Sequence, residues 1–315
     1  SGKMEIYPSI DACPKMDNAS LTIGSYDGLH RGHHELIRNM VSYAHAKNIP
    51  SVVVTFDPHP RHLLDPPAEK WPLIMSMTQK INVLEALGID AVLVIPFTKS
   101  FSQTSATSFM NEIIVQKFSP KKIFIGYDHH FGFDREGTPE FLSSYCQDNN
   151  IDIDIMEPMK DDSVIISSSH IRELILSGYL RRANFELGSI YGIEGCVFRG
   201  AGRGKGLNFP TANVKPIEKN QLLPMPGVYF VRGRIIGLNL YGMCNFGVRP
   251  TFDEDELVME VHFFHEQLDD LYEKIIMVEF LERIRDEKKF PSPNKLIEQL
   301  NKDKARCLKL QAKYE

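Results

Sequence analysis

The first half of the chain alternates short β-branched runs with stretches whose apolar residues recur at helical spacing. Between Leu21 and Ile155 the runs are SVVVTF, AVLVIPF, KKIFIGY and IDIDIM. This alternation is typical of a parallel sheet wound with crossover helices, because parallel strands need long connections and helices supply them. Ligands bind such sheets at the carboxyl ends of the strands. We therefore predict an α/β domain whose binding edge lies where strands end and helices begin.

The second half of the chain has a different pattern. From Tyr191 to Leu281 the segments are strand-like, punctuated by glycines and without intervening helices, which predicts a compact, mainly antiparallel β-barrel. Pro291 and Pro293 then introduce a C-terminal helix. The predicted apolar stripe of this helix consists of Leu296, Ile297, Leu300, Cys307 and Leu308. We place the boundary near Leu187, which gives domains of residues 1–187 and 188–315.

Composition argues against several classes of partner. The net charge of −5 and the pI of about 6.1 provide no basic excess that would attract nucleic acid. No apolar run reaches the roughly 18–20 residues of a membrane span, and no secretion signal is recognised. The five cysteines are scattered, so the sequence predicts reduced, mostly buried thiols rather than a zinc ribbon or a CxxC pair. We expect a soluble, cytoplasmic protein that binds neither nucleic acid nor membranes; self-association stays open.

The segment YDGLHRGHHEL places two histidines at a strand-to-helix corner. His30 and His33 flank Gly32, after the short run from Leu21 to Gly24 and at the start of a predicted helix. A helix start carries unpaired N–H groups and a partial positive charge, so it attracts anions, phosphate above all. Gly32 is expected to let the backbone approach such a ligand, and two neutral imidazoles add donors. On this motif alone, solvent-exposed surface histidines remain the alternative.

A second helix start, in ISSSHIREL, favours the anion-binding interpretation. Ser167, Ser168 and Ser169 can cap this helix. Arg172 lies in its first turn, where a cation opposes the helix dipole unless an anion shares the site. The alternative is an arginine that extends to solvent. Together the two helix starts predict a polyphosphate site at the edge of the wound sheet.

A glycine-rich segment in the second half predicts another phosphate site. GAGRGKGLNFPTANV, from Gly200, is neither a P-loop nor a Gly-x-Gly-x-x-Gly pattern, but its glycines can let backbone amides surround phosphates. After Pro210 the extended chain places Thr211 and Asn213 on one side, and their oxygens suit Mg²⁺. Glu260, in LVMEVHFF, is a candidate base if a nucleotide lies nearby. An ordinary loop and a solvent-facing strand residue remain the alternative.

The motifs of the first half resemble those of a known family. YDGLHRGH is similar to the His-x-Gly-His motif of nucleotidyltransferases, and SSSHIR to their Ser/Thr-Ser-x-x-Arg signature. TFDPHPR and GYDHHFG resemble the N-terminal module of bacterial bifunctional riboflavin kinase/FAD synthetases. The chain departs from that pattern at Tyr26, where phenylalanine is usual, and at His129, where another aromatic residue is usual. The resemblance implies a nucleotidyltransferase-type, Rossmann-like fold for the first domain.

This resemblance implies that the first domain transfers an adenylyl group from ATP to FMN. It assigns His30 and His33 to the transferring phosphate, and Arg172 with the serines of SSSHIR to the β- and γ-phosphates. It groups Gly24 and Gly32 with the ATP-binding residues. The flavin-binding residues that it implies are Phe56, Asp57, Pro58, His59, Arg61 and Asp128.

The second half resembles a riboflavin kinase. FPTAN, PGVYFV, NFGVRPTF, MEVHFF and LYEKIIMVEFLERIRDEKKF follow the order of that family, with departures at Gly206 and Asn208, where threonine and glycine are usual. The resemblance implies that Thr211 and Asn213 bind Mg²⁺ with ATP and that Glu260 takes the proton of the ribityl 5′-hydroxyl. The other residues that it implies are Gly202, Gly204 and Lys205 for ATP, and Arg285 and Phe290 for flavin.

We predict a bifunctional enzyme of flavin biosynthesis that uses ATP and Mg²⁺, with riboflavin as substrate, FMN as intermediate and FAD as product. One alternative is a nucleotidyltransferase with another acceptor or nucleotide, such as a cytidylyltransferase, but this leaves FPTAN and MEVHFF unexplained. The other is a non-catalytic flavin-binding or regulatory protein, which needs neither a base nor so many phosphate donors.

Overall fold

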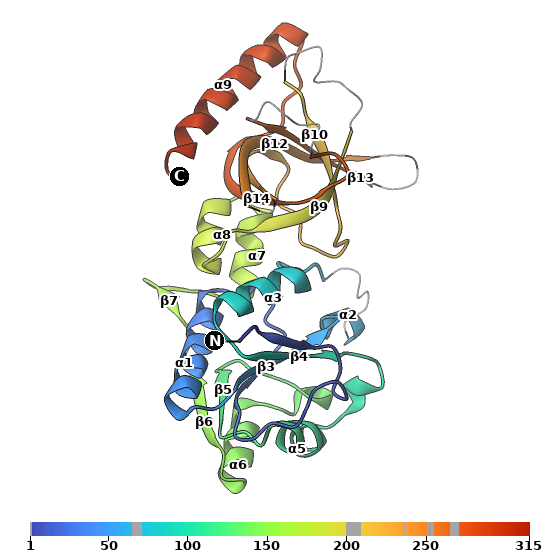
Figure 1. Ribbon diagram of the computed structural model, residues 1–315. Helices are drawn as coiled ribbons and strands as arrows, with labels where there is room; N and C mark the ends of the chain where they lie inside the picture. Colours follow the sequence, from blue (N-terminus) through green and yellow to red (C-terminus); the bar gives the residue numbers. More distant parts are fainter. Residues whose placement is uncertain are drawn as a thin grey trace. The chain divides into compact units, whose positions relative to one another are not determined.

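The computed structural model describes residues 2–64, 71–199, 209–235, 237–250, 252, 255–264 and 271–315 (Figure 1). The chain divides into two compact units, Ser1–Ser168 and Ser169–Glu315. Much of the glycine-rich segment lies outside the described residues. The predicted ATP-binding residues Gly202, Gly204 and Lys205, and the family departures Gly206 and Asn208, belong to that part.

The first unit is built on a six-stranded sheet in which every pairing is parallel. Its order is β1-β4-β3-β2-β5-β6. The strands are β1 (Glu5–Tyr7), β2 (Ser20–Ile23), β3 (Ser51–Asp57), β4 (Ala91–Pro96), β5 (Lys122–Gly126) and β6 (Asp152–Met156). The wound α/β fold predicted from the β-branched runs is confirmed. The sequence does not predict β1, because a strand of 3 residues is too short to show a pattern.

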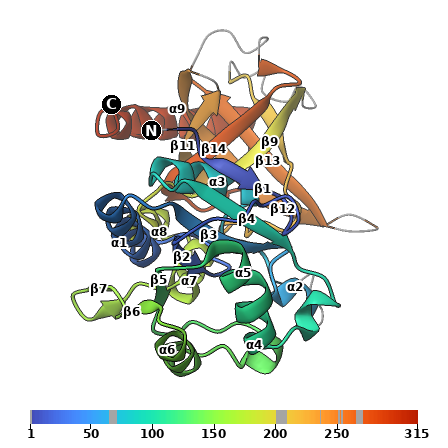
Figure 2. The ribbon, with the colours of Figure 1, turned by 60° about the horizontal axis from the view of Figure 1, so that its bottom comes forward.

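Both faces of this sheet are covered, as the alternation along β3 shows. Val52 and Val54 belong to one core, together with Phe118. Val53 belongs to the other core, which includes Ile37 of the first helix. Successive strand residues face opposite sides, so a strand covered on both faces must be apolar almost throughout. Figure 2 shows α1 and α5 on different sides of the strands.

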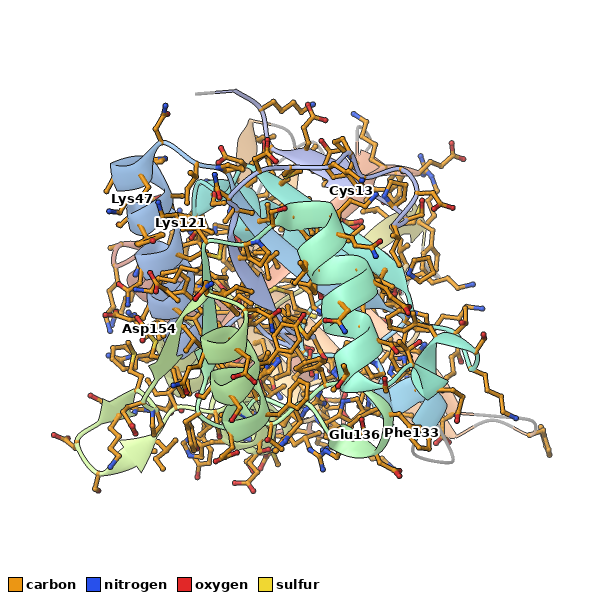
Figure 3. All side chains as sticks on the ribbon, turned by 90° about the horizontal axis from the view of Figure 1, so that it is seen from below. Cys13, Lys47, Lys121, Phe133, Glu136 and Asp154 are labelled. Atoms are coloured by element: carbon orange, nitrogen blue, oxygen red, sulfur yellow. The ribbon has the colours of Figure 1, made fainter. Side chains whose placement is uncertain are left out.

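Helices and short turns connect the strands of the first unit. They are α1 (Arg31–Lys47), α2 (Arg61–Leu64), α3 (Met77–Ala86), η2 (Phe101–Gln103), α4 (Ala106–Ser108), the π-helical η3 (Phe109–Val115), α5 (Gln116–Phe118), η4 (Phe133–Arg135) and α6 (Pro139–Asp148). A small hairpin of β7 (Lys160–Asp161) and β8 (Val164–Ile165) follows. Figure 3 shows Glu136 near the start of the α4–α5 stretch, where its carboxylate accepts the N–H of Ala106 at 3.4 Å.

The second unit is a closed antiparallel barrel that follows two short helices, α7 (Ser168–Leu176) and α8 (Leu180–Leu187). The strand order is β10-β13-β12-β11-β14-β9, and β9 pairs with β10 to close the barrel. The strands are β9 (Gly192–Arg199), β10 (Ala212–Pro216), β11 (Gly227–Ile235), β12 (Leu238–Pro250), β13 (Asp255–Phe263) and β14 (Ile275–Arg285). The predicted barrel is confirmed.

The C-terminal helix α9 (Pro293–Gln311) covers part of the outer face of the barrel. Its apolar residues in that contact are Ile297, Leu300, Cys307 and Leu310. Of the predicted stripe, Leu296 lies outside this cluster and Leu308 is 47% exposed, so the prediction for Leu308 is wrong. The residue after Cys307 is turned by about 100° around the helix axis, and Leu310 packs in its place.

Candidate active sites

His30 closes the corner between β2 and α1. Its Nδ1 accepts hydrogen bonds from the backbone N–H groups of Gly32 (3.0 Å) and His33 (3.4 Å), so this side chain is the N-cap of α1. Because Nδ1 accepts, the neutral ring carries its proton on Nε2. A Cβ at residue 32 would lie 2.9 Å from Cε1 of His30, so the ring requires a glycine there. The Gly32 N–H is therefore taken up by the His30 ring, and this side chain offers Nε2 as its remaining donor at the helix start.

His30 and His33 form a stacked pair of neutral rings. Their centroids are 3.7 Å apart and their planes differ by 19°. The pKa of His30 is lowered to about 4, and the pKa of His33 is lowered well below its ordinary value. In both cases burial is the largest cause. Both rings are therefore neutral at pH 7, as predicted, although burial contributes most. Nδ1 of His33 is buried and has no hydrogen-bond partner in the described part of the chain.

The two residues that depart from the family pattern in the first half both make aromatic contacts. Tyr26 presents its ring to His33 edge-on at a centroid distance of 4.9 Å, and its hydroxyl hydrogen-bonds to Oγ1 of Thr22. His129 packs against Phe131 at a centroid distance of 5.5 Å. Burial lowers the pKa of His129 to about 4, so its ring packs as a neutral aromatic group.

The residues predicted for the first site converge at one edge of the sheet. Gly24 follows β2, Asp57 ends β3, and Asp128 follows β5. These strands are neighbours in the order β3-β2-β5, so their carboxyl ends lie side by side. Asp57, Pro58 and Asp128 are exposed there. The structure therefore brings these residues to the edge where a wound sheet binds its ligands.

Ser168 ties the SSSHIR segment to the histidine corner. Its Oγ donates to the backbone carbonyl of Asp27 at 2.7 Å. The carboxylate of Asp27 in turn accepts the N–H of Ile74 at 3.0 Å, and Asp27 is 7% exposed. The corner is thus held by two separate segments. Further along α7, burial lowers the pKa of Arg172 to about 10, so its guanidinium is still positively charged at pH 7.

The TFDPHPR segment divides between core and surface. Phe56 is 7% exposed and lies in an aromatic cluster with Phe97, Phe101 and Phe109. Phe56 thus packs in the core of the first unit, and its flavin contact stays a prediction. Nδ1 of His59 accepts the N–H of Arg61 at 3.1 Å, and the Arg61 guanidinium lies 4.0 Å from the ring centroid of Trp71. Burial, chiefly, lowers the pKa of His59 to about 3. The flat ring of Trp71 is therefore part of this site, although no motif indicated it.

In the second unit, three polar side chains form a row across neighbouring barrel strands. Asn213 of β10 is opposite Glu260 of β13, and Glu260 is opposite Asn245 of β12. Opposed residues of antiparallel strands present their side chains on the same face. The adjacent residues that fill the barrel are Ala212, Cys244 and Val261, each 0% exposed. The row therefore lies on the outer face of the barrel. It unites the predicted Asn213 and Glu260 with Asn245, the first residue of NFGVRPTF, to which the sequence analysis assigned no role.

His262 holds the segment that contains Thr211. Its Nδ1 donates to the backbone carbonyl of Pro210 at 2.9 Å, since a carbonyl can only accept. His262 is 7% exposed, and burial lowers its pKa, so the ring is neutral at pH 7. Strand β13 thereby carries Glu260 and also fixes the residue before Thr211. The alternation of MEVHFF places Glu260 and His262 on one face, which is the signal that could have identified His262.

Arg285 is engaged with α9 in this structure. Its Nε lies 3.1 and 3.0 Å from the carboxylate oxygens of Asp303, and its Nη2 lies 2.9 Å from one of them. The side chains of Arg285 and Asp303 are 13% and 3% exposed. The Arg285 guanidinium also lies 5.7 Å from the ring centroid of Phe290. The two predicted flavin residues are therefore together, and Asp303 orients the arginine.

Replacement of Asp303 with alanine should destabilise the attachment of α9. The change leaves Arg285 as a buried cation without its carboxylate, which costs about 3 kcal/mol. We expect faster hydrogen exchange in β14 and α9, measured by mass spectrometry. Glu298→Ala on the same helix is the matched control: its partner Lys295 is 3.4 Å away and both side chains are about 60% exposed, so the effect should be small. Equal exchange in the two variants would contradict this role of Asp303.

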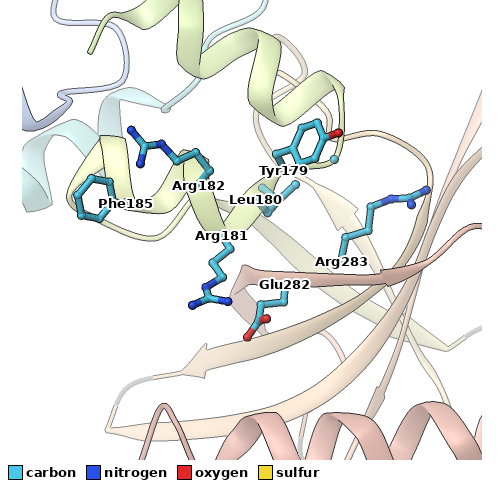
Figure 4. Close-up of a pocket in the computed structure, with 8 residues that line it drawn as sticks. Tyr179, Leu180, Arg181, Arg182, Phe185, Glu282 and Arg283 are labelled. Carbon is cyan, nitrogen blue, oxygen red and sulfur yellow. The ribbon is translucent and has the colours of Figure 1, made fainter. Parts of the chain in front are cut away.

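A separate pocket of about 460 Å³ in the second unit contains none of the predicted residues (Figure 4). Its lining includes Tyr179, Arg181, Phe185, Glu282 and Arg283. Arg283 is engaged by Asp286 at 2.8 Å and by the carbonyl of Pro226 at 2.6 Å. This pocket is distinct from the polar row at Glu260.

Comparison with known proteins identifies the family of each half of the chain. A family model described as FAD synthetase matches residues 13–170, and one described as riboflavin kinase matches residues 187–311. The bifunctional riboflavin kinase/FMN adenylyltransferase of Bacillus subtilis (strain 168) is 32% identical over 292 residues, which cover 92% of this chain and 91% of the relative. The protein of the same name from Escherichia coli (strain K12) is 33% identical over 287 residues, 90% of each chain.

A solved structure has the same fold over nearly the whole chain. It is the crystal structure named Macrolide-efflux Protein from Streptococcus pneumoniae, with a TM-score of 0.86 and 30% identity; the match covers 95% of this chain and 97% of that one. In the described part of the present chain, no helix has both the length and the apolar character that a membrane crossing requires.

The fold and the two sites define an ATP-dependent transferase that joins a nucleotidyltransferase-type domain to a kinase barrel. The chain belongs to the bifunctional riboflavin kinase/FMN adenylyltransferase family. It phosphorylates riboflavin to FMN with ATP, and it adenylylates FMN with ATP to FAD and pyrophosphate. The riboflavin kinase match accounts for FPTAN and MEVHFF, which the alternative of another nucleotidyltransferase leaves unexplained.

Proposed function

We propose that Glu260 is the general base of the kinase step. The observation that carries this assignment is the strand register that sets Asn213 opposite Glu260. The 5′-hydroxyl of riboflavin is neutral and a weak nucleophile, so its proton passes to the Glu260 carboxylate as its oxygen attacks the γ-phosphorus of ATP. The bond from that phosphorus to the bridging oxygen breaks, and ADP leaves. Oδ1 of Asn245, buried and without a hydrogen-bond partner among the described residues, offers an acceptor for a substrate hydroxyl beside this base.

Thr211 and Asn213 are the proposed ligands of Mg²⁺. Their hydroxyl and amide oxygens are hard donors, which suit a cation that keeps several waters and shares the ATP phosphates. No group of three or more His, Cys, Asp or Glu side chains in the described ranges could hold a metal ion instead. When bound, the ion supplies positive charge that offsets the charge of the phosphates. We assign Gly202, Gly204 and Lys205 to the ATP phosphates on the family resemblance alone.

For the second step, we propose that His30 and His33 donate hydrogen bonds to the α-phosphate of ATP. An oxygen of the FMN phosphate attacks the α-phosphorus, the bond to the bridging oxygen breaks, and pyrophosphate leaves. The attacking phosphate is already ionised, so this step needs charge stabilisation more than a base. Arg172 and the turn of Ser167, Ser168 and Ser169 bind the β- and γ-phosphates, and we assign Gly24 to ATP on the family resemblance alone. The hydroxyl proton of Ser168 is engaged by Asp27, so Ser168 serves to hold the turn.

The flavin rings are proposed to lie beside two aromatic surfaces. In the first unit these contacts come from Asp57, Pro58, His59, Arg61 and Asp128, and Trp71 supports the Arg61 guanidinium. In the barrel, Arg285 and Phe290 contact riboflavin. An arginine plane and an aromatic ring both stack on a flat heterocycle, and Asp303 holds the Arg285 plane in place.

We also propose a domain boundary near Leu187 and a cytoplasmic site of action. Helix α8 ends at Leu187, and the riboflavin kinase match begins at residue 187. All five cysteines are free thiols and four of them are buried, in keeping with a reducing compartment, and both reactions consume ATP. Small molecules are the expected partners, without nucleic acid or membranes.

A product time course tests whether one chain performs both steps. The protein is incubated with riboflavin and Mg-ATP, and riboflavin, FMN and FAD are separated by chromatography, with a parallel reaction that starts from FMN. We expect FMN first and FAD after it, because FMN is the acceptor of the second step. FMN without FAD in both reactions would contradict the roles of His30 and His33 while leaving the barrel assignment intact. If neither FMN nor FAD forms, the alternative of a non-catalytic flavin-binding protein becomes the favoured interpretation.

A further inference from the structure

Lys80 is a buried lysine beside the histidine corner. It lies in α3, which Ser76 and Gln79 cap, and it is 3% exposed. Its Nζ donates to the backbone carbonyl of Ser25 at 2.8 Å. Lysine is almost never buried unless it is paired. In the described part of the chain no carboxylate lies within ion-pairing distance of this ammonium, and the Ser25 carbonyl is its hydrogen-bond partner.

The charged and titratable groups around Lys80 come from three segments. Asp57, at the end of β3, is the charge that favours the ammonium form. The positive charge of Lys80 helps to lower the pKa of His33, in α1, and of His59, in the segment after β3. Ser25 itself belongs to the corner that leads to His30. The ammonium is therefore directed between the histidine corner and the proposed flavin segment.

A buried cation with two unused donors has an unfavourable free energy, and the neutral rings of His33 and His59 cannot neutralise it. A bound phosphate can neutralise the positive charge of Lys80. Adenylyl transfer brings the phosphate of FMN against the phosphates of ATP, and negative charge then accumulates on the leaving pyrophosphate. A fixed ammonium at this point stabilises that charge without reorganisation.

We propose that Lys80 is a further catalytic residue of FMN adenylylation, whose ammonium contacts the phosphate oxygens of the reactants at the corner of His30 and His33. The inference rests on the proposed role of that corner. It also differs from a purely structural role, in which Lys80 only holds the carbonyl of Ser25. A structural brace needs the hydrogen bond, whereas charge stabilisation needs the positive charge during the reaction.

The pH profile distinguishes these two roles. Burial lowers the pKa of Lys80 to about 8, and Asp57 opposes that shift. Lys80 is thus charged below about pH 8 and neutral above it, so FAD formation should fall as the pH rises through 8. His33 and His59 are neutral throughout this range, because the pKa of each is lowered below its ordinary value. In Lys80→Arg the side chain keeps its charge, and the fall should disappear.

The experiment compares the full chain with its Lys80→Met and Lys80→Arg variants, with FMN and Mg-ATP as substrates. We expect Lys80→Met to lower kcat/KM for FAD formation by about 100-fold and Lys80→Arg to retain activity within about 10-fold with a flat profile above pH 8. Riboflavin phosphorylation by the same preparations reports on folding and should be unchanged. Lys117→Met is the matched control, because Lys117 also donates to a backbone carbonyl of the first unit, that of Cys13, at 2.6 Å.

Two outcomes would overturn the proposal: activity of Lys80→Met within about threefold of the parent chain, or the same fall above pH 8 in Lys80→Arg. The second outcome assigns Lys80 to the structural role. Failure of the corner itself gives a different result, since His33→Ala would then be as active as the parent chain. If His33→Ala forms FAD at the parent rate while Lys80→Met is inactive, the role of Lys80 stands and His33 is not part of the site.

Discussion

Glu260→Gln should lower FMN formation by about 1,000-fold or more and leave FAD formation from supplied FMN unchanged. The substitution keeps the size of the side chain and removes the carboxylate that accepts the proton of the 5′-hydroxyl. Glutamine fits the same place between Asn213 and Asn245 in the strand register, so the barrel should stay intact. The measurement is the rate of FMN formation from riboflavin and Mg-ATP, followed by chromatography.

Glu256→Gln is the matched control for this prediction. Glu256 lies on the same strand, β13, is exposed, and is opposite Arg249 rather than an asparagine. Its loss should change neither reaction. The proton-acceptor role of Glu260 is refuted if Glu260→Gln retains kinase activity within about 10-fold of the parent chain, because loss of a positioned base costs at least about 100-fold.

The fold follows from patterns that the sequence carries in full. The near-continuous β3 run reads as a buried parallel strand because both faces of the sheet are covered, with Val53 on one side and Val54 on the other. Patterns that extend over only a few residues do not predict the structure reliably. The three residues of β1 show no periodicity, and Leu308 looks like part of the apolar stripe although Leu310 is the residue that packs. Helical spacing fixes a face only to within one neighbouring residue.

Sequence motifs predict some residues of the site, but they do not reveal the residues that only tertiary contacts bring to it. Spacing singles out His30, Gly32 and His33, but only the structure shows that His30 caps the helix with its own ring and occupies the Gly32 N–H. Lys80 resembles an ordinary polar residue of a short helix. The available signal is that it lies four residues before the buried Leu84, on the same face of α3, where a lysine should not be buried.

His33→Ala should lower FAD formation from FMN by about 1,000-fold while riboflavin phosphorylation continues at its normal rate. His33 is a neutral ring whose Nδ1 is buried without a hydrogen-bond partner among the described residues, and it stacks on His30 at 3.7 Å. Its removal eliminates one proposed phosphate donor and leaves His30 without the ring that orients it. The loss should appear in kcat more than in the KM for ATP, because the donor acts mainly on the charge that develops in the transition state.

The control for this prediction is His45→Ala, in the exposed last turn of the same helix, which should leave both reactions unchanged. Since the pKa of His33 lies well below its ordinary value, the parent chain should show no loss of FAD formation from titration of this ring between pH 6 and 8, about the range where a solvent-exposed histidine changes charge. FAD formation by His33→Ala within about threefold of the parent rate would remove His33 from the chemistry. A large loss in kcat, with the kinase step unaffected, would instead support contact between the transferring phosphate and the stacked pair.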